Sequence, residues 1–277
     1  MIRKFKSLVP KKYQKLIANF YPFNKSSPYT QLMPNIEKLN VSDFFLFRLG
    51  DYDTVFIAEN NLALLIASPA RCKHRFYFFD LDGCACGSFE VESELFHYTL
   101  HINKAMTGGK LTGGFIHQIE YSDNLLKNLL DDPKEIVFQH RGYSGYKAAQ
   151  DRSSIFSFVH GNFGTMYHSN SKIFSLSRQR VKHCYTPQIA IRNERLYEFF
   201  FLNSTSKKLI ISVIHIDKDN QAKIDRKIII KPFGSYKYEL DTFNNMEVLN
   251  ISWQSALPVG RAVIFENNGV LFDVFHS

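Results

Sequence analysis

The sequence is poor in the features that mark secreted and membrane-spanning proteins. It contains 4 cysteines in 277 residues, too few to cross-link a chain of this length, so we expect free thiols and a cytoplasmic location. No apolar run approaches the ~20 residues that a transmembrane helix needs. Pro10 and several lysines interrupt the start of the chain, a pattern that argues against a secretory signal.

Acidic residues are missing from the first part of the chain, where the first one is Glu37. The formal net charge of +8 is therefore concentrated in the N-terminal tail, and the remainder is close to neutral. A nearly neutral body lacks the basic face that nucleic acid requires, so we expect no nucleic-acid partner.

The tail itself, residues 1–28, combines this positive charge with a helical pattern. Tyr13, Leu16, Ile17 and Phe20 recur at the spacing of one helix face. A short basic amphipathic helix can lie on an anionic membrane, and the alternative is a helix that packs against the folded body. The residues proposed for membrane contact, at the inner face of the membrane, are Lys4, Lys6, Lys11, Lys12 and Lys15.

Short runs of Phe, Ile, Val and Tyr dominate the rest of the chain, separated by turn residues as in strands. Two of these runs resemble each other: Phe76 to Gly83 and Val213 to Asn220 align at an offset of 137 residues, with Asp80 matching Asp217. Further segments recur downstream in the same order, although β-rich segments can also match by chance. Such self-similarity predicts an internal duplication.

The fold class predicted from this pattern is all-β, with two related antiparallel β-sandwich-like units and a short N-terminal amphipathic helix. A small barrel is the competing architecture, because sheet order does not follow from the pattern. The predicted domains are the tail and linker (1–28), a first sandwich (41–140), an inter-unit connection with candidate binding loops (141–186) and a second sandwich (187–277).

The string from Phe78 to Cys84 contains D-x-D-G after an apolar run and resembles the nucleophile motif of haloacid-dehalogenase-type phosphotransferases. That resemblance implies parallel βαβ units, whereas the residues after Cys84 have the pattern of a strand. The matching string at Asp217 ends in Asn220, which favours a hairpin turn in both places, because Gly and Asn tolerate positive φ.

Cysteine and histidine pairs raise the question of a zinc site. A hairpin near residue 82 places Cys72 and Cys84 roughly 25 Å apart, too far for shared coordination. His97 and His101 flank Thr99 on one strand face and are expected to face solvent. A metal site there would need a third ligand, for which His117 is a candidate by count alone. We therefore expect no metal and no cofactor.

The segment 141–186 differs from the rest in mixing polar residues, aromatics and glycines, a composition suited to a loop-built binding site. The structural alternative is a long connection that packs across both sandwiches. The candidate ligand-binding residues are His140, Arg141, Tyr143, Tyr146, Lys147, His160, Asn162, Arg178 and Arg180.

These observations favour a non-catalytic binding or scaffold protein for a carbohydrate or protein partner, with a homo-oligomer left open. The basic start resembles those of bacterial envelope-polysaccharide enzymes, which implies a carbohydrate context in cell-envelope metabolism. The alternative is an enzyme that acts on a sugar or sugar phosphate, with His140 or His160 as general acid/base and Arg141 holding an anion.

Overall fold

The computed structural model describes twelve stretches of the chain, and within them every element except the helix α4 (Asn61–Ile66) is a strand. The chain is therefore all-β, as its pattern predicts. The described residues are 40–121, 138–140, 142–151, 155–169, 172–175, 183–187, 190–205, 207–217, 219–242, 248–255, 261–267 and 272–276.

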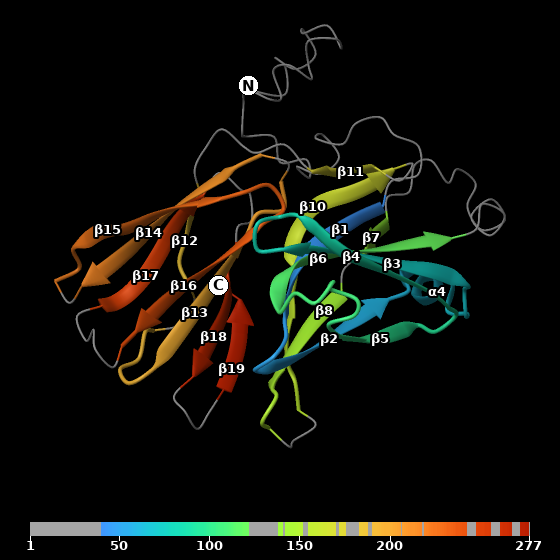
Figure 1. The fold of residues 1–277 in the computed structure, drawn as a ribbon, viewed down its shortest axis with the longest axis horizontal. Helices are drawn as coiled ribbons and strands as arrows, with labels where there is room; N and C mark the ends of the chain where they lie inside the picture. Colours follow the sequence, from blue (N-terminus) through green and yellow to red (C-terminus); the bar gives the residue numbers. More distant parts are fainter. Residues whose placement is uncertain are drawn as a thin grey trace, which may run out of the picture. The chain divides into compact units, whose positions relative to one another are not determined.

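Two sheets form the sandwich that we call the N-terminal sandwich (Figure 1). The first has the order β11-β10-β1-β6-β3-β4, with β7 beside β1, and the second has the order β5-β2-β8-β9. All of these pairings are antiparallel except that of β7 with β1. The strands are β1 (Asn40–Arg48), β2 (Tyr52–Glu59), β3 (Cys72–Asp80), β4 (Ala85–Ser93), β5 (His97–Ile102), β6 (Thr112–Tyr121), β7 (Phe138–His140), β8 (Gly142–Ala148), β9 (Ser157–His160), β10 (Asn162–Ser169) and β11 (Lys172–Ser175).

The other two sheets form the C-terminal sandwich, with the orders β12-β17-β14-β15 and β16-β13-β18-β19 (Figure 1). Their pairings are antiparallel. The strands are β12 (His183–Tyr185), β13 (Leu196–Leu202), β14 (Leu209–Asp217), β15 (Ala222–Ile230), β16 (Ser235–Asp241), β17 (Val248–Ser255), β18 (Val263–Asn267) and β19 (Phe272–His276).

Each sandwich buries one aromatic-rich core between its two sheets. In the N-terminal sandwich, Phe45, Phe56 and Phe115 pack edge-on and stacked with ring centroids 4.7–5.3 Å apart. In the C-terminal sandwich, Trp253 packs edge-on against Phe201 at 5.3 Å. Alternation along each strand places every second side chain in these cores.

A third hydrophobic cluster lies between the sandwiches, because β1 and β13 are apolar on both faces. Phe44 and Leu46 of β1 share this cluster with Phe200 of β13 and Phe265 of β18. All four side chains are fully buried. The two sandwiches therefore share an interior, and both belong to the compact unit Lys38–Ser277.

One buried ion pair joins the sandwiches within this shared cluster. The guanidinium of Arg48 donates to both carboxylate oxygens of Glu198, at 2.5 and 3.0 Å. The Arg48 and Glu198 side chains are 12% and 8% exposed, and the guanidinium lies 3.9 Å from the ring centre of Tyr52. Lys237 also contacts Glu198 at 3.2 Å, so this carboxylate is held by two cations.

The D-x-D strings are hairpin turns, as predicted. The Asp80 carboxylate accepts from the N–H groups of Asp82 and Cys84, and Gly83 has φ +80°. At the second site the Asp217 carboxylate accepts in the same way from residues 219 and 221, and Asn220 has φ +58°. The two turns thus match bond for bond.

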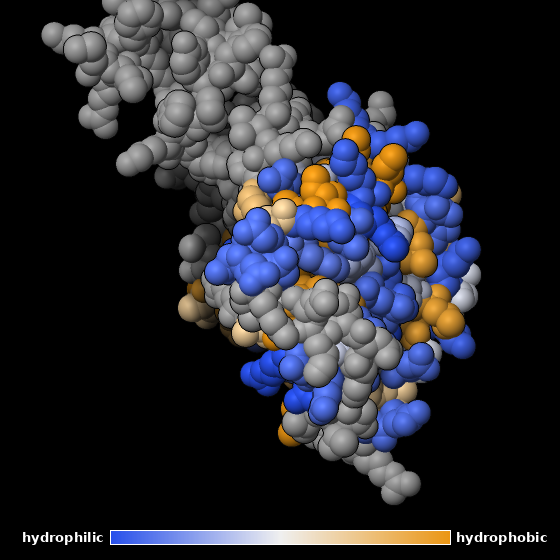
Figure 2. Space-filling model, turned by 90° about the vertical axis from the view of Figure 1, so that its left-hand side faces the viewer, coloured by the Kyte–Doolittle hydropathy of each residue, from blue (hydrophilic) through white to orange (hydrophobic). Residues whose placement is uncertain are grey.

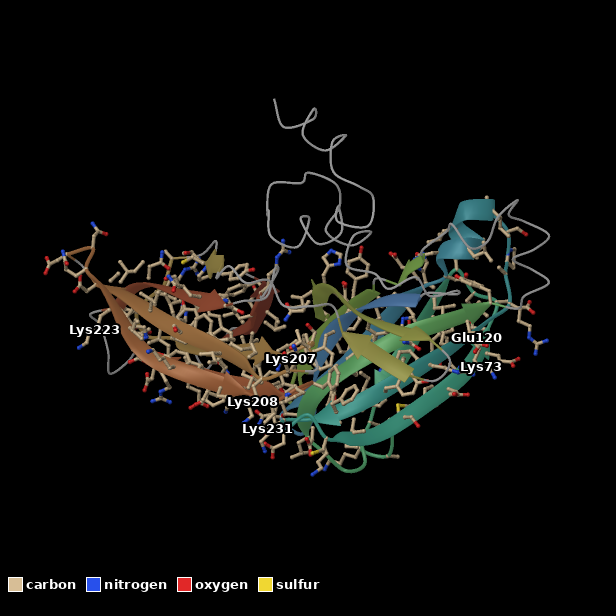
Figure 3. The ribbon with its side chains drawn as sticks, turned by 90° about the horizontal axis from the view of Figure 1, so that it is seen from above. Lys73, Glu120, Lys207, Lys208, Lys223 and Lys231 are labelled. Carbon is tan, nitrogen blue, oxygen red and sulfur yellow. The ribbon has the colours of Figure 1, made fainter. Side chains whose placement is uncertain are left out.

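The surroundings of the two turns differ. The β3–β4 turn is docked on the loop between β15 and β16: Ser235 donates its N–H to the carbonyl of Leu81 at 3.0 Å, and Lys231 pairs with Asp82 at 2.9 Å. A Cβ on Gly83 would lie 1.8 Å from the carbonyl oxygen of Pro232. Figure 3 labels Lys231 at this junction. In the β14–β15 turn, Asp219 and Asn220 are exposed.

The strand orders of the two sandwiches also correspond. The order β1-β6-β3-β4 matches β12-β17-β14-β15, and β5-β2-β8-β9 matches β16-β13-β18-β19. This correspondence supports the internal duplication, which stays a prediction. Residues 141–186, expected as a connection, contribute β8, β9, β10, β11 and β12 to these sheets. The predicted domain boundaries remain untested.

Among the described residues, no helix has the length and apolar character needed to cross a membrane. The expected tail helix and its lysines, Lys4, Lys6, Lys11, Lys12 and Lys15, lie outside the described residues.

Candidate functional site

The outer face of the sheet β5-β2-β8-β9 carries an aromatic strip at its β8–β9 end. Tyr143 and His160 are cross-strand neighbours whose ring centroids lie 4.5 Å apart. Phe158, one step along β9, pairs with Gly145. A Cβ on Gly145 would lie 2.5 Å from the Phe158 ring, so the absence of a side chain there lets this ring sit directly over the strand.

Alternation along β8 explains why these side chains face outward. Gly142, Ser144 and Tyr146 are buried, and Tyr146 donates its hydroxyl to the carbonyl of Leu46 inside the protein at 2.7 Å. The intervening residues Tyr143, Gly145 and Lys147 therefore face the opposite side of the sheet. Phe158 leaves 44% of its surface exposed, so its ring is accessible from this side of the sheet.

Polar side chains flank the aromatic strip on the same face. Lys147 contacts Asp53 of β2 at 3.5 Å and lies 5.3 Å from the ring centre of Phe156. On the other side, His97, Thr99 and His101 of β5 are exposed. Thr99 shares a cross-strand level with Ile57, Tyr143 and His160, so the face spans four strands, or roughly 14 Å.

The structure brings three of the predicted ligand-binding residues to this face, namely Tyr143, Lys147 and His160. Tyr146 is 1% exposed and Asn162 is 0% exposed, so both lie in the interior. His140 lies on β7, opposite Ser42 of β1, and its side chain is not described. Arg141, Arg178 and Arg180 lie outside the described residues.

Cys72 and His74 belong to a buried polar chain rather than to the exposed face. Nε2 of His74 lies 3.4 Å from the Cys72 sulfur, and Nδ1 of His74 lies 2.9 Å from Nε2 of His117. Burial raises the pKa of Cys72 to about 12 and lowers the pKa of His74 to about 4. Both groups are therefore neutral at pH 7, and this environment opposes the thiolate that a cysteine nucleophile needs.

Acid is expected to destabilise the protein through His74. The pKa of His74 in the folded protein lies below the ordinary 6.5, so the unfolded chain binds the proton more readily. The contribution of neutral His74 to stability is therefore full above pH 6.5 and falls as the pH drops toward 4. The shift corresponds to a loss of about 3 kcal/mol. Urea unfolding at pH 7.0, 5.5 and 4.5 measures it; an equally steep dependence in His74→Leu would contradict the assignment to this histidine.

A cavity of about 230 Å³ lies near the start of β3, lined by Arg71, Cys72, Lys73, Glu92, Glu120 and Tyr121. Its charges balance: Arg71 pairs with Glu92, and Lys73 is the cross-strand neighbour of Glu120, as Figure 3 shows at one end of the N-terminal sandwich. With two cations and two carboxylates in its lining, the cavity has no field of one sign to select a charged ligand.

The two cysteines considered from the sequence for a shared metal site lie far apart. Cys72 faces Ser93 at one end of the β3–β4 hairpin, and Cys84 lies at the turn. His117 is in the core, whereas His97 and His101 are exposed on the other sheet. Among the described residues, no group of three or more His, Cys, Asp or Glu side chains is arranged to hold a metal ion.

Sequence reasoning missed Phe158, Thr99 and the histidines of β5 as members of the face. The signal was the alternation from Gly142 to Ala148, which places Tyr143 and Lys147 on one side of a strand and Tyr146 on the other. Treating this segment as loop hid the alternation. The neighbours contributed by β5 follow only from the sheet order, which depends on pairing between distant segments.

Comparisons with known proteins identify no relative. No model of a protein family matches the chain, and no curated protein matches it. Among solved structures, a β-glucuronidase from glycoside hydrolase family 2 aligns with 84% of this chain at 9% identity and a TM-score of 0.15. The chain spans 23% of that protein, and a similarity this low carries no inference about function.

Proposed function

We propose that this protein is a non-catalytic carbohydrate-binding protein and that the outer face of the sheet β5-β2-β8-β9 is its binding surface. The observation that carries the proposal is the aromatic strip. Phe158 lies exposed over Gly145, next to the contacting rings of Tyr143 and His160. An exposed ring beside two half-buried rings provides a flat apolar surface on which a ligand ring can stack.

The composition of the face favours a sugar over an entirely apolar ligand. A sugar ring has an apolar C–H face that can cover Phe158 or Tyr143, and hydroxyl groups around its edge. Thr99, His101 and Lys147, on either side of the strip, supply donors and acceptors for those hydroxyls. Apolar surface with a few placed polar groups is the usual composition of small-molecule sites.

The enzyme alternative requires Arg141 beside His140 or His160. Arg141 lies outside the described residues, and His140 and His160 belong to strands of different sheets. Catalysis on a sugar or sugar phosphate therefore stays a prediction from the sequence. A place in bacterial cell-envelope polysaccharide metabolism, membrane contact through the tail, a homo-oligomer and a cytoplasmic location also stay predictions.

Removal of either ring of the aromatic strip is expected to abolish most of the binding. A glycan array with the full-length protein selects a ligand, and isothermal titration calorimetry then compares variants. Phe158→Ala and Tyr143→Ala should each weaken binding about tenfold or more, equivalent to about 1.4 kcal/mol. A bound glycan should also raise the melting temperature of the native protein, and raise that of either variant by less at the same glycan concentration.

The control is Leu95→Ala, which removes a side chain that is 61% exposed in the β4–β5 loop and should leave affinity unchanged. Melting temperatures of all three variants show whether each is folded. Wild-type affinity in both ring variants would refute the proposed surface, and binding of a protein partner with no glycan on the array would favour the protein-binding alternative.

A further inference from the structure

A second cluster of polar side chains lies at the edge of the C-terminal sandwich, where β15 and β16 approach each other. Nε2 of His215 on β14 lies 2.6 Å from the hydroxyl of Tyr238 on β16. That hydroxyl donates to Oδ2 of Asp225 on β15 at 3.0 Å. Three strands from two sheets thus contribute to one hydrogen-bonded chain.

An irregularity in β15 brings Asp225 into the cluster. Val213 pairs with Arg226 and Ile214 pairs with Ile224, so Asp225 is an extra residue in the strand. A β-bulge of this kind bends the strand and redirects the side chains beside it. The bulge accounts for a carboxylate that reaches Tyr238 from an edge strand whose other residues largely face solvent.

The protons in this chain have one consistent arrangement. The Tyr238 hydroxyl has a single hydrogen, which it donates to Asp225, so it accepts from the Nε2–H of His215. Burial lowers the pKa of His215 and raises that of Tyr238, so both are neutral at pH 7. The lone pair of His215 then lies on Nδ1, for which the described residues provide no partner.

The surroundings of this acceptor are positively charged. β15 carries three basic residues, Lys223, Arg226 and Lys227, and one acidic residue, Asp225. Lys223 is the cross-strand neighbour of His215, and Figure 3 labels it near the outer end of β15. Within the described part of the chain, neither Lys223 nor Lys227 forms an ion pair. The side of the molecule seen in Figure 2 is largely hydrophilic, with scattered hydrophobic residues.

We propose that this edge is a second binding site, specific for an acidic sugar of the uronic acid class. The sugar carboxylate pairs with Arg226 and Lys223, and its hydroxyls donate to Nδ1 of His215 and to Asp225. Tyr236, whose hydroxyl lies 3.5 Å from Arg226, borders the site. The proposal is independent of the aromatic strip on β8 and β9, because it uses another sheet pair and other residues.

The test is calorimetric titration of the full-length protein with trimers of galacturonate, glucuronate and mannuronate, and with neutral galactotriose. At least one uronate trimer should bind, more weakly as salt rises, because salt screens exposed charges. His215→Ala and Arg226→Gln should each weaken this binding about tenfold. Tyr238→Phe keeps the buried ring but removes the hydroxyl that fixes the histidine, and should weaken it about threefold.

Asp219→Asn and Lys208→Gln alter exposed charges outside the cluster and serve as matched controls with unchanged affinity. Circular dichroism shows whether each variant is folded. The proposal is overturned if no uronate trimer binds, if galactotriose binds equally well, or if His215→Ala and Arg226→Gln leave the affinity intact. Binding that is lost in Phe158→Ala instead would assign the sugar to the aromatic strip and also overturn it.

Discussion

Arg48→Met is expected to lower the free energy of unfolding by about 4 kcal/mol, which chemical denaturation measures. The substitution leaves the Glu198 carboxylate buried at 8% exposure without its bidentate partner. Lys237 remains 3.2 Å away, but its side chain is 42% exposed and supplies a single contact. The cost arises mainly from the charge left behind rather than from the contact removed.

Two comparisons show whether the lost stability comes from the unpaired Glu198 or from removing an arginine in general. Arg48→Met combined with Glu198→Met removes both charges and should be more stable than Arg48→Met alone, because no buried charge remains unpaired. Arg71 forms an exposed pair with Glu92, with the side chains 72% and 51% exposed, so Arg71→Met should cost less than about 1 kcal/mol. Equal losses in Arg48→Met and Arg71→Met would show that Glu198 is not buried as described.

Gly83→Ala is expected to destabilise the protein by about 4 kcal/mol, an effect confined to severe structural conflicts. The added Cβ would lie 1.8 Å from the carbonyl oxygen of Pro232, and φ at this position is +80°. The turn must move off the β15–β16 loop, which breaks the hydrogen bond between Ser235 and Leu81. Differential scanning calorimetry measures the loss and shows whether the variant unfolds in one transition or in two.

The second turn provides a matched control for the first. Asn220 has the same left-handed conformation, with φ +58°, but is exposed, so Asn220→Ala should cost only the local strain of about 1 kcal/mol. The difference between the variants isolates the contact with the C-terminal sandwich. If Gly83→Ala proved as mild as Asn220→Ala, the docked position of the β3–β4 turn would be wrong.

The local features of this fold were predictable from the sequence, and the long-range ones were not. Asp80 and Asp217 identified two turns because the chemistry of a hairpin turn involves four or five adjacent residues. The pairing of β2 with β8 joins residues about 90 positions apart, and no local pattern encodes it. For the same reason, the partners of Tyr143 on the binding face became evident only from the sheet order.

Whether a candidate site residue lies on the binding face or in the interior depends on its strand face and not on its residue type. Tyr143 and Tyr146 are the same amino acid three positions apart, yet one is half-buried on the outer face and the other is enclosed at 1% exposure. Composition alone had placed both in a binding site. The assignment of a face depends on whether the segment is a strand, and glycine at positions 142 and 145 had favoured a loop.

The interior shared by the two sandwiches has a practical consequence for dissecting the protein. A fragment ending before β13 would leave Phe44 and Leu46 facing water, and the complementary fragment would expose Phe200 and Phe265. Hydrophobic patches of this kind promote association. Half-length fragments are therefore poor reagents for mapping either proposed sugar site, and point substitutions in the intact chain are the sounder route.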